Sequence, residues 1–76
     1  MMTFDELVAE LVRAYREAPH NEINARIILF GIKYADDLRH VNVSDIEEAV
    51  SELTERNSYA PEISNGVKLA KYVELK

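Results

Sequence analysis

An apolar stripe with helical spacing runs through the first residues of the chain, and a helix with such a stripe needs other elements to cover it. Thr3 and Glu6 have the spacing of a capping box, in which each side chain accepts a backbone N–H that the helix start leaves free. Pro19 disfavours helical geometry in the residue before it, so we expect the helix to end near Glu17 or Ala18. The stripe consists of Phe4, Leu7, Val8, Leu11, Val12 and Tyr15, which follow the i, i+3, i+4, i+7, i+8, i+11 pattern.

A second helix is predicted from Asn21, its N-cap, to about Leu38. It is apolar around most of its circumference, which is typical of a helix that is contacted from several sides. Gly31 costs roughly 1 kcal/mol relative to alanine in a helix, so it either permits the close approach of another helix or is simply tolerated. The solvent edge carries the i,i+4 pairs Glu22–Arg26 and Lys33–Asp37, and the apolar residues are Ile23, Ile27, Ile28, Leu29, Phe30, Ile32, Tyr34, Ala35 and Leu38.

Two shorter helices are predicted in the second half of the chain. Ser44 and Glu47 repeat the capping-box spacing and start the first of them, while Pro61 suits the first turn of the second, where its missing N–H does no harm. Gly66 either weakens the last helix or marks a tight contact. Between Ser44 and Arg56, five acids stand against one arginine, so this segment has a net charge of −4. The inward-facing residues are Ile46, Ala49, Val50 and Leu53, then Tyr59, Ile63, Val67 and Ala70, with Leu69 and Val73 flanking.

These segments predict one compact all-α domain of four helices with short connections, spanning residues 1–76. A chain of this length has a thin core and rarely exceeds ~3–5 kcal/mol of net stability without a metal, a disulfide or a partner subunit. Because cysteine is absent and there are only two histidines, we predict no disulfide, no metal site and no cofactor.

The sequence offers no support for catalysis, calcium binding or membrane insertion. No serine lies in a G-x-S-x-G turn, His20 and His40 stand at helix ends without partners at ligand spacing, and the acids after Ser44 lack the spacing of an EF-hand loop. The longest nearly unbroken apolar stretch, residues 27–32, is too short to cross a bilayer, and the acidic start does not resemble a secretion signal. We therefore expect a cytoplasmic protein that is not an enzyme, without a small-molecule substrate.

The last two predicted helices, joined by a turn, have the outline of a helix-turn-helix, whose second helix lies in the DNA major groove. Residues 57–76 carry a net charge of +1, whereas the acidic third helix would repel phosphates that it faced. The connection between the two helices is longer than the ~3–4-residue turn of a standard helix-turn-helix. A monomer with so small a number of cations would also bind DNA weakly, whereas a symmetric dimer would double the number of phosphate contacts. The candidate nucleic-acid-binding residues are Arg56, Ser64, Asn65, Lys68, Lys71 and Tyr72, on or near the face opposite the apolar stripe.

Three stretches of the chain resemble a family of small bacterial proteins described as HTH-like: MTFDELVAELVRAYREAP at residues 2–19, LFGIKYADDL at 29–38 and SYAPEISNGVKLAKYVELK at 58–76. The last helix is similar to the pattern E-I-x-x-G-x-K-L-A-K-Y-V, which is matched from Glu62 to Val73. Ser64 and Asn65 occupy positions that are often more basic in the family. The resemblance implies an HTH-like fold and, by analogy, double-stranded DNA as a partner.

A different class of function also fits the sequence. The first two helices carry much apolar surface for so small a core, and the third helix is strongly acidic. These features are typical of a protein–protein interaction module or a homodimer that binds no nucleic acid. Two measurements separate the hypotheses. One is the oligomeric state, and the other is the effect of substitutions at Lys68 and Lys71 on nucleic-acid binding.

Overall fold

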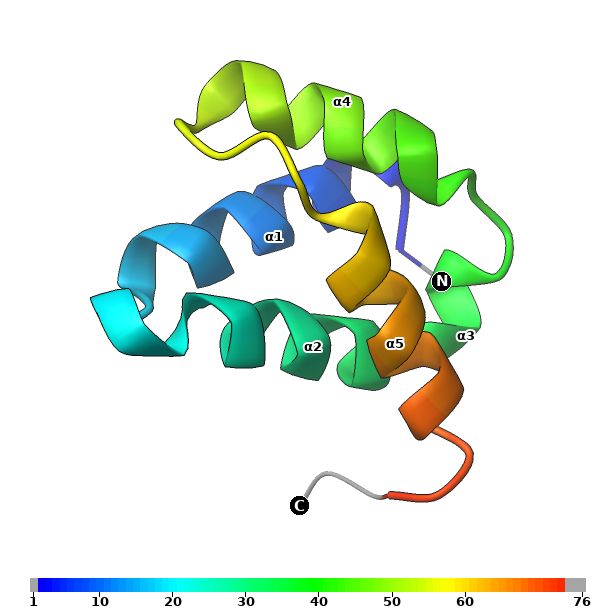
Figure 1. Ribbon diagram of the computed structural model, residues 1–76. Coiled ribbons are helices and arrows are strands. Elements are labelled where there is room, and N and C mark those ends of the chain that lie inside the picture. Colours follow the sequence, from blue (N-terminus) through cyan, green and yellow to red (C-terminus); the bar gives the residue numbers. More distant parts are fainter. Residues whose placement is uncertain (1, 74–76) are drawn as a thin grey trace.

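The computed structural model describes residues 2–73, in which every regular element is a helix. Figure 1 shows α1 and α2 side by side and antiparallel, α4 on the other side of α1, and α5 crossing α2. The prediction of a compact all-α fold is confirmed. Residues 2–73 contain five α-helices where the sequence predicts four, because a short helix, α3, forms separately. The elements are α1 (Phe4–Glu17), the 3₁₀ turn η1 (His20–Glu22), α2 (Ile23–Lys33), α3 (Ala35–Leu38), α4 (Val43–Leu53) and α5 (Ala60–Leu69).

Helix α1 begins and ends where its local sequence predicts. The Thr3 Oγ1 accepts the N–H of Glu6 at 3.1 Å, and the Glu6 carboxylate accepts the N–H of Thr3 at 2.9 Å, so the capping box is confirmed. The last helical residue is Glu17. Within the predicted stripe the central leucines and valines are buried, whereas Phe4 is exposed at the edge and Tyr15 is half-buried.

The prediction of a single second helix from Asn21 to Leu38 is wrong. Asn21 lies inside the 3₁₀ turn η1, and the chain leaves helical geometry at Tyr34, with φ −110° and ψ 25°, before α3 begins. The break redirects α3 so that its Ala35 and Leu38 side chains are buried. The predicted pair Lys33–Asp37 is also wrong, because the Asp37 carboxylate instead accepts the backbone N–H of Met2 at 3.0 Å.

The predicted capping box of α4 is wrong as well. The N-cap is Asn42, whose side-chain oxygen accepts the N–H of Ser44 at 2.9 Å, and the helix begins at Val43. Glu47 does not reach back to the start of its own helix. Its carboxylate binds the backbone at the beginning of α5 instead.

The core lies where all four long helices meet, and α2 and α5 approach one another most closely at two glycines. A Cβ added to Gly31 would lie 2.9 Å from the Gly66 Cα and 2.6 Å from the Ile63 carbonyl oxygen. The interpretation of both glycines as sites of close helix approach is therefore confirmed. The fully buried side chains are Leu7, Leu11, Ile27, Ile46, Val50, Tyr59 and Ile63.

Candidate nucleic-acid interface

Helix α5 docks on the core through the side that its apolar stripe predicts. Ile63 and Gly66 are buried against α2, while Val67 is half-buried. The opposite side of the helix carries Asn65 and Lys68, both exposed. Polar groups able to contact a nucleic acid are therefore presented to solvent rather than to the core.

The other predicted site residues surround this exposed side. Ser64 is half-buried beside Asn65. Helix α5 ends at Leu69, so Lys71 and Tyr72 lie in the following turn. The prediction that these two residues belong to the outward face of the last helix is therefore wrong. The Tyr72 N–H still donates to the Leu69 carbonyl at 2.8 Å. The side chains of Lys71 and Tyr72 are both exposed.

Arg56 lies before α5, on the connection from α4, and its guanidinium is engaged within the domain. Its Nη2 lies 3.1 Å from Glu62 Oε1, and its Nε donates to the Ser58 carbonyl. The same group stacks over the Tyr59 ring at 5.4 Å from the ring centre. Five of the six predicted residues thus occupy α5 and the turn after it, while the charge of Arg56 is balanced by Glu62.

Glu47 holds the start of α5 in place. One of its oxygens, Oε2, accepts the N–H groups of Tyr59 and Ala60, each at 2.8 Å. These two hydrogen bonds lower the pKa of the Glu47 carboxyl, because they favour its charged form. The sequence offers no local signal for this contact, since the partners lie 12 and 13 residues away.

The connection from α4 to α5 is anchored by Tyr59. Its side chain is fully buried, and its hydroxyl lies 2.6 Å from the Thr54 Oγ1. Burial raises the pKa of this phenol. The connection comprises residues 54–59, which is longer than the ~3–4-residue turn of a standard helix-turn-helix.

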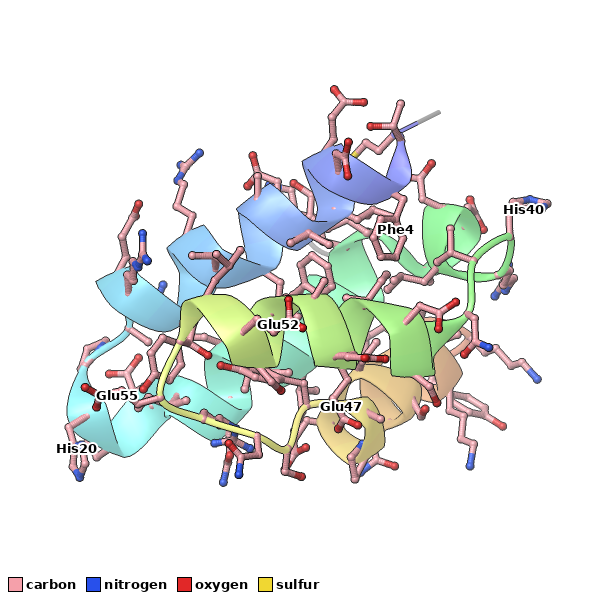
Figure 2. The ribbon with its side chains drawn as sticks, turned by 90° about the horizontal axis from the view of Figure 1, so that it is seen from above. Phe4, His20, His40, Glu47, Glu52 and Glu55 are labelled. Carbon is pink, nitrogen blue, oxygen red and sulfur yellow. The ribbon has the colours of Figure 1, made fainter. Side chains whose placement is uncertain are left out.

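Arginines and lysines have different surroundings in the described part of the chain. Four arginines form ion pairs with carboxylates, whereas Lys33, Lys68 and Lys71 form none with residues 2–73. Figure 2 shows the α4 acid Glu47 near the start of α5 and Glu55 in the connection that follows the far end of α4. The amines of Lys68 and Lys71 are therefore not neutralised by the acidic helix.

Sequence comparison identifies the family. A family model described as an HTH-like domain matches residues 3–76. The chain belongs to the HTH-like domain family. No curated protein and no solved structure matches it.

The two histidines of this HTH-like domain do not converge on a site. Figure 2 shows His20 and His40 at opposite ends of the molecule, and both are exposed. Among residues 2–73, no group of three or more histidine, aspartate or glutamate side chains is arranged to hold a metal ion. Over the same range, no helix combines the length and the apolarity needed to cross a bilayer.

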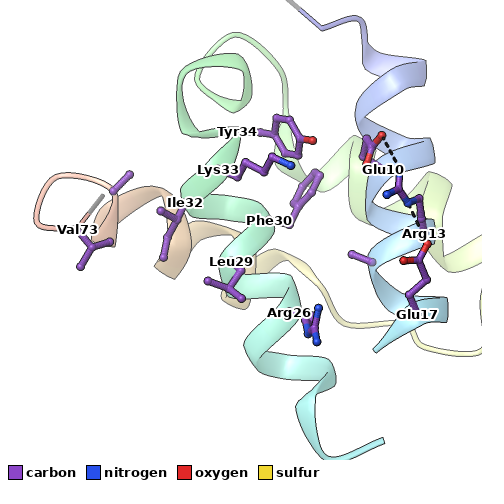
Figure 3. A pocket seen from close by; sticks show the side chains of 12 residues that line it. Glu10, Arg13, Glu17, Arg26, Leu29, Phe30, Ile32, Lys33, Tyr34 and Val73 are labelled. Atoms are coloured by element: carbon purple, nitrogen blue, oxygen red, sulfur yellow. Dashed lines mark hydrogen bonds and ion pairs between the residues drawn. The ribbon is translucent and has the colours of Figure 1, made fainter. Parts of the chain in front are cut away.

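An open groove of about 750 Å³ lies on a different surface of the HTH-like domain, between α1, α2 and the end of α5 (Figure 3). The α1 wall is charged and includes Arg13, which pairs with Glu17 at 2.9 Å. The other side is largely apolar and includes Leu29, Ile32 and Val73. None of the six predicted nucleic-acid residues lines this groove.

Acid is expected to weaken the attachment of α5, because it protonates Glu47. The folded-state pKa of Glu47 lies below its ordinary value of 4.5, so the contact stabilises the fold above about pH 4.5 and is lost as the pH falls through the folded pKa. Glu47→Ala should lower the free energy of unfolding at neutral pH by about 1 kcal/mol, the usual effect of losing a helix cap. Urea denaturation at pH 7 and at a series of lower pH values measures both effects.

The exposed neighbour Glu48 supplies a matched control. Glu48→Ala should leave the free energy of unfolding nearly unchanged, and Glu47→Gln should retain an acceptor while losing part of the pH dependence. Equal behaviour of the Glu47 and Glu48 variants would contradict a capping role for Glu47.

Proposed function

We propose that this HTH-like domain binds double-stranded DNA through the exposed side of α5 and the turn that follows it. The observation that carries the proposal is the pair of exposed amines, Lys68 and Lys71, which form no ion pair with the described residues. Lysine neutralises phosphates, which supply most of the affinity of DNA-binding proteins. Membership in the HTH-like family supports the same role.

The neighbouring polar residues have the chemistry for contacts with bases. Asn65 can pair with adenine through two hydrogen bonds, and Ser64 can bond a base or a phosphate. Tyr72, which is 81% exposed, can donate its hydroxyl to the backbone of the duplex. Arg56 would contribute a phosphate contact only after exchanging its partner Glu62.

Because the connection between α4 and α5 is long, we propose that α5 contacts DNA by itself and not as the second helix of a standard helix-turn-helix. Tyr59 and Glu47 attach the start of α5 to the rest of the domain. A monomer that uses Lys68 and Lys71 would contact few phosphates. Each phosphate contact contributes about −0.9 to the slope of log affinity against log salt, so we expect weak binding that is lost at moderate salt.

NMR titration of the labelled domain with a short duplex at low and moderate salt tests the proposal. Shifts concentrated at residues 56–72 and reduced by salt are expected. Lys68→Gln should weaken binding by roughly three- to tenfold at low salt and make the salt slope less negative by about one. The absence of shifts at low salt would refute DNA binding, and shifts centred elsewhere would refute α5 as the reading helix.

Arg13→Gln is the matched control, because it removes the same charge from α1. Arg13 is exposed and paired with Glu17, away from the proposed surface. If DNA binding depends on α5, this variant should bind like the unmodified domain. Equal weakening by Arg13→Gln and Lys68→Gln would show that only net charge matters.

A further inference from the structure

The ion pair between Arg56 and Glu62 lies beside the surface proposed to bind DNA. Glu62, Asn65 and Lys68 are spaced three residues apart on α5, so they form a diagonal row across the helix surface. Arg56 approaches the first member of this row from the connection before α5, with its Nη2 3.1 Å from Glu62 Oε1. A phosphate bound beside Asn65 would therefore lie within about one helical turn of the Glu62 carboxylate.

The Glu62 carboxylate depends on Arg56 for compensation of its charge. Only 20% of the Glu62 side chain and 23% of the Arg56 side chain are exposed, so solvent and salt screen this pair weakly. Among residues 2–73, the carboxylate accepts a hydrogen bond from Arg56 alone, and its other oxygen, Oε2, is buried without a partner. Loss of Arg56 would leave a largely buried charge uncompensated, which is strongly unfavourable.

Two further contacts hold the Arg56 guanidinium against Glu62. Its Nε donates to the Ser58 carbonyl, and the group stacks over the Tyr59 ring at 5.4 Å from the ring centre. A phosphate could take Arg56 for itself only by breaking contacts of this side chain. The Glu62 carboxylate would then lose its partner and would also repel the phosphate, since the two groups carry charges of the same sign.

We infer that Glu62 limits the affinity of this surface for DNA, because it keeps Arg56 as its own partner when DNA binds. The inference rests on the proposed function, in which Lys68 and Lys71 carry the phosphate contacts. Arg56 and Glu62 together add no net charge to the surface. Removing the Glu62 charge while keeping its shape would make Arg56 a third cation that can neutralise a phosphate.

Glu62→Gln tests the inference, because glutamine has nearly the same shape and keeps an oxygen that can accept the Arg56 hydrogen bond. At low salt this variant should bind a short duplex roughly three- to tenfold more tightly, with a salt slope more negative by about one. Fluorescence anisotropy of a labelled duplex over a range of salt concentrations measures both quantities.

Glu17→Gln is the matched control, because it removes the acid from another arginine–glutamate pair. Glu17 lies 2.9 Å from Arg13 on α1, away from the proposed surface, and both side chains are exposed. This variant changes the net charge of the chain by the same amount as Glu62→Gln. If the position of Arg56 beside α5 is what matters, Glu17→Gln should bind DNA like the unmodified domain.

The side-chain Nε–H signal of Arg56 in an NMR titration provides a readout that does not depend on how well a variant folds. In the unmodified domain this signal should keep its position while the backbone signals of α5 shift, and in Glu62→Gln it should move with them.

Binding by the unmodified domain with no gain in Glu62→Gln would overturn the inference and leave the proposed function standing. An equal gain in Glu17→Gln would also overturn it, as would movement of the Arg56 Nε–H signal when the unmodified domain binds DNA. If neither the unmodified domain nor Glu62→Gln bound DNA, the proposed function itself would be refuted, and the inference with it.

Discussion

Replacing Gly66 by alanine is expected to unfold the domain. The new Cβ would overlap the Ile28 carbonyl oxygen and lie 2.8 Å from the Gly31 Cα. Both atoms belong to the backbone of α2, so no side chain can rotate away, and the two helices would have to separate. Overpacking usually costs about 1–3 kcal/mol and more where nothing can move. That loss approaches the whole stability of about 3–5 kcal/mol expected for a chain of this size.

The sign of the change in stability caused by a substitution to alanine distinguishes an effect of packing from an effect of helix propensity. In an open helix position, glycine to alanine stabilises by about 1 kcal/mol. Asn24→Ala, at an exposed position of α2, also replaces a weaker helix former by alanine and should raise the melting temperature slightly. Gly66→Ala should instead abolish the cooperative transition. Thermal denaturation followed by circular dichroism measures both. A Gly66→Ala variant as stable as the unmodified domain would contradict the close crossing of α2 and α5.

Replacing Ile27 by aspartate should also abolish folding. The Ile27 side chain is fully buried, and no charged side chain among residues 2–73 is buried with it to pair with a carboxylate. An unpaired charge in such a place costs several kcal/mol, more than a small domain can lose. The ¹H–¹⁵N correlation spectrum should collapse to the narrow dispersion of an unfolded chain.

Ala25→Asp adds the same charge to the same helix and provides the control. Ala25 is exposed near the start of α2, where an acid interacts favourably with the helix dipole. This variant should keep a dispersed spectrum and a melting temperature near that of the unmodified domain. If Ile27→Asp folded equally well, Ile27 would not be part of a single, well-packed core.

Several features of the fold could be predicted because neighbouring residues decide them. The capping box of α1 involves residues three positions apart, and Pro61 starts α5 through its own ring geometry. Helical spacing of apolar residues likewise predicts that Ile63 faces inward and Lys68 outward, as observed. The HTH-like family was also predicted from the sequence, and the family comparison confirms it.

Other features depend on residues that are distant along the chain. Glu47 has the spacing of a capping box with Ser44, yet its carboxylate caps α5, because the fold brings two free N–H groups of that helix within 2.8 Å. The break at Tyr34 lies within an unbroken helical pattern. Arg56 has the composition of a phosphate ligand, but the structure pairs it with Glu62.

The sequence by itself determined that long helices form, which side of each is apolar and where α1 begins and ends, because capping, proline geometry and periodicity act over a few residues. It also left two explanations for Gly31 and Gly66: each glycine is merely tolerated in its helix, or it allows another helix to approach closely. Only the tertiary structure decided between them, since each glycine makes room for the other across a crossing of two helices. The same packing leaves Lys68 and Leu29 exposed on different surfaces, because contacts between distant segments determine which sides of the helices remain uncovered.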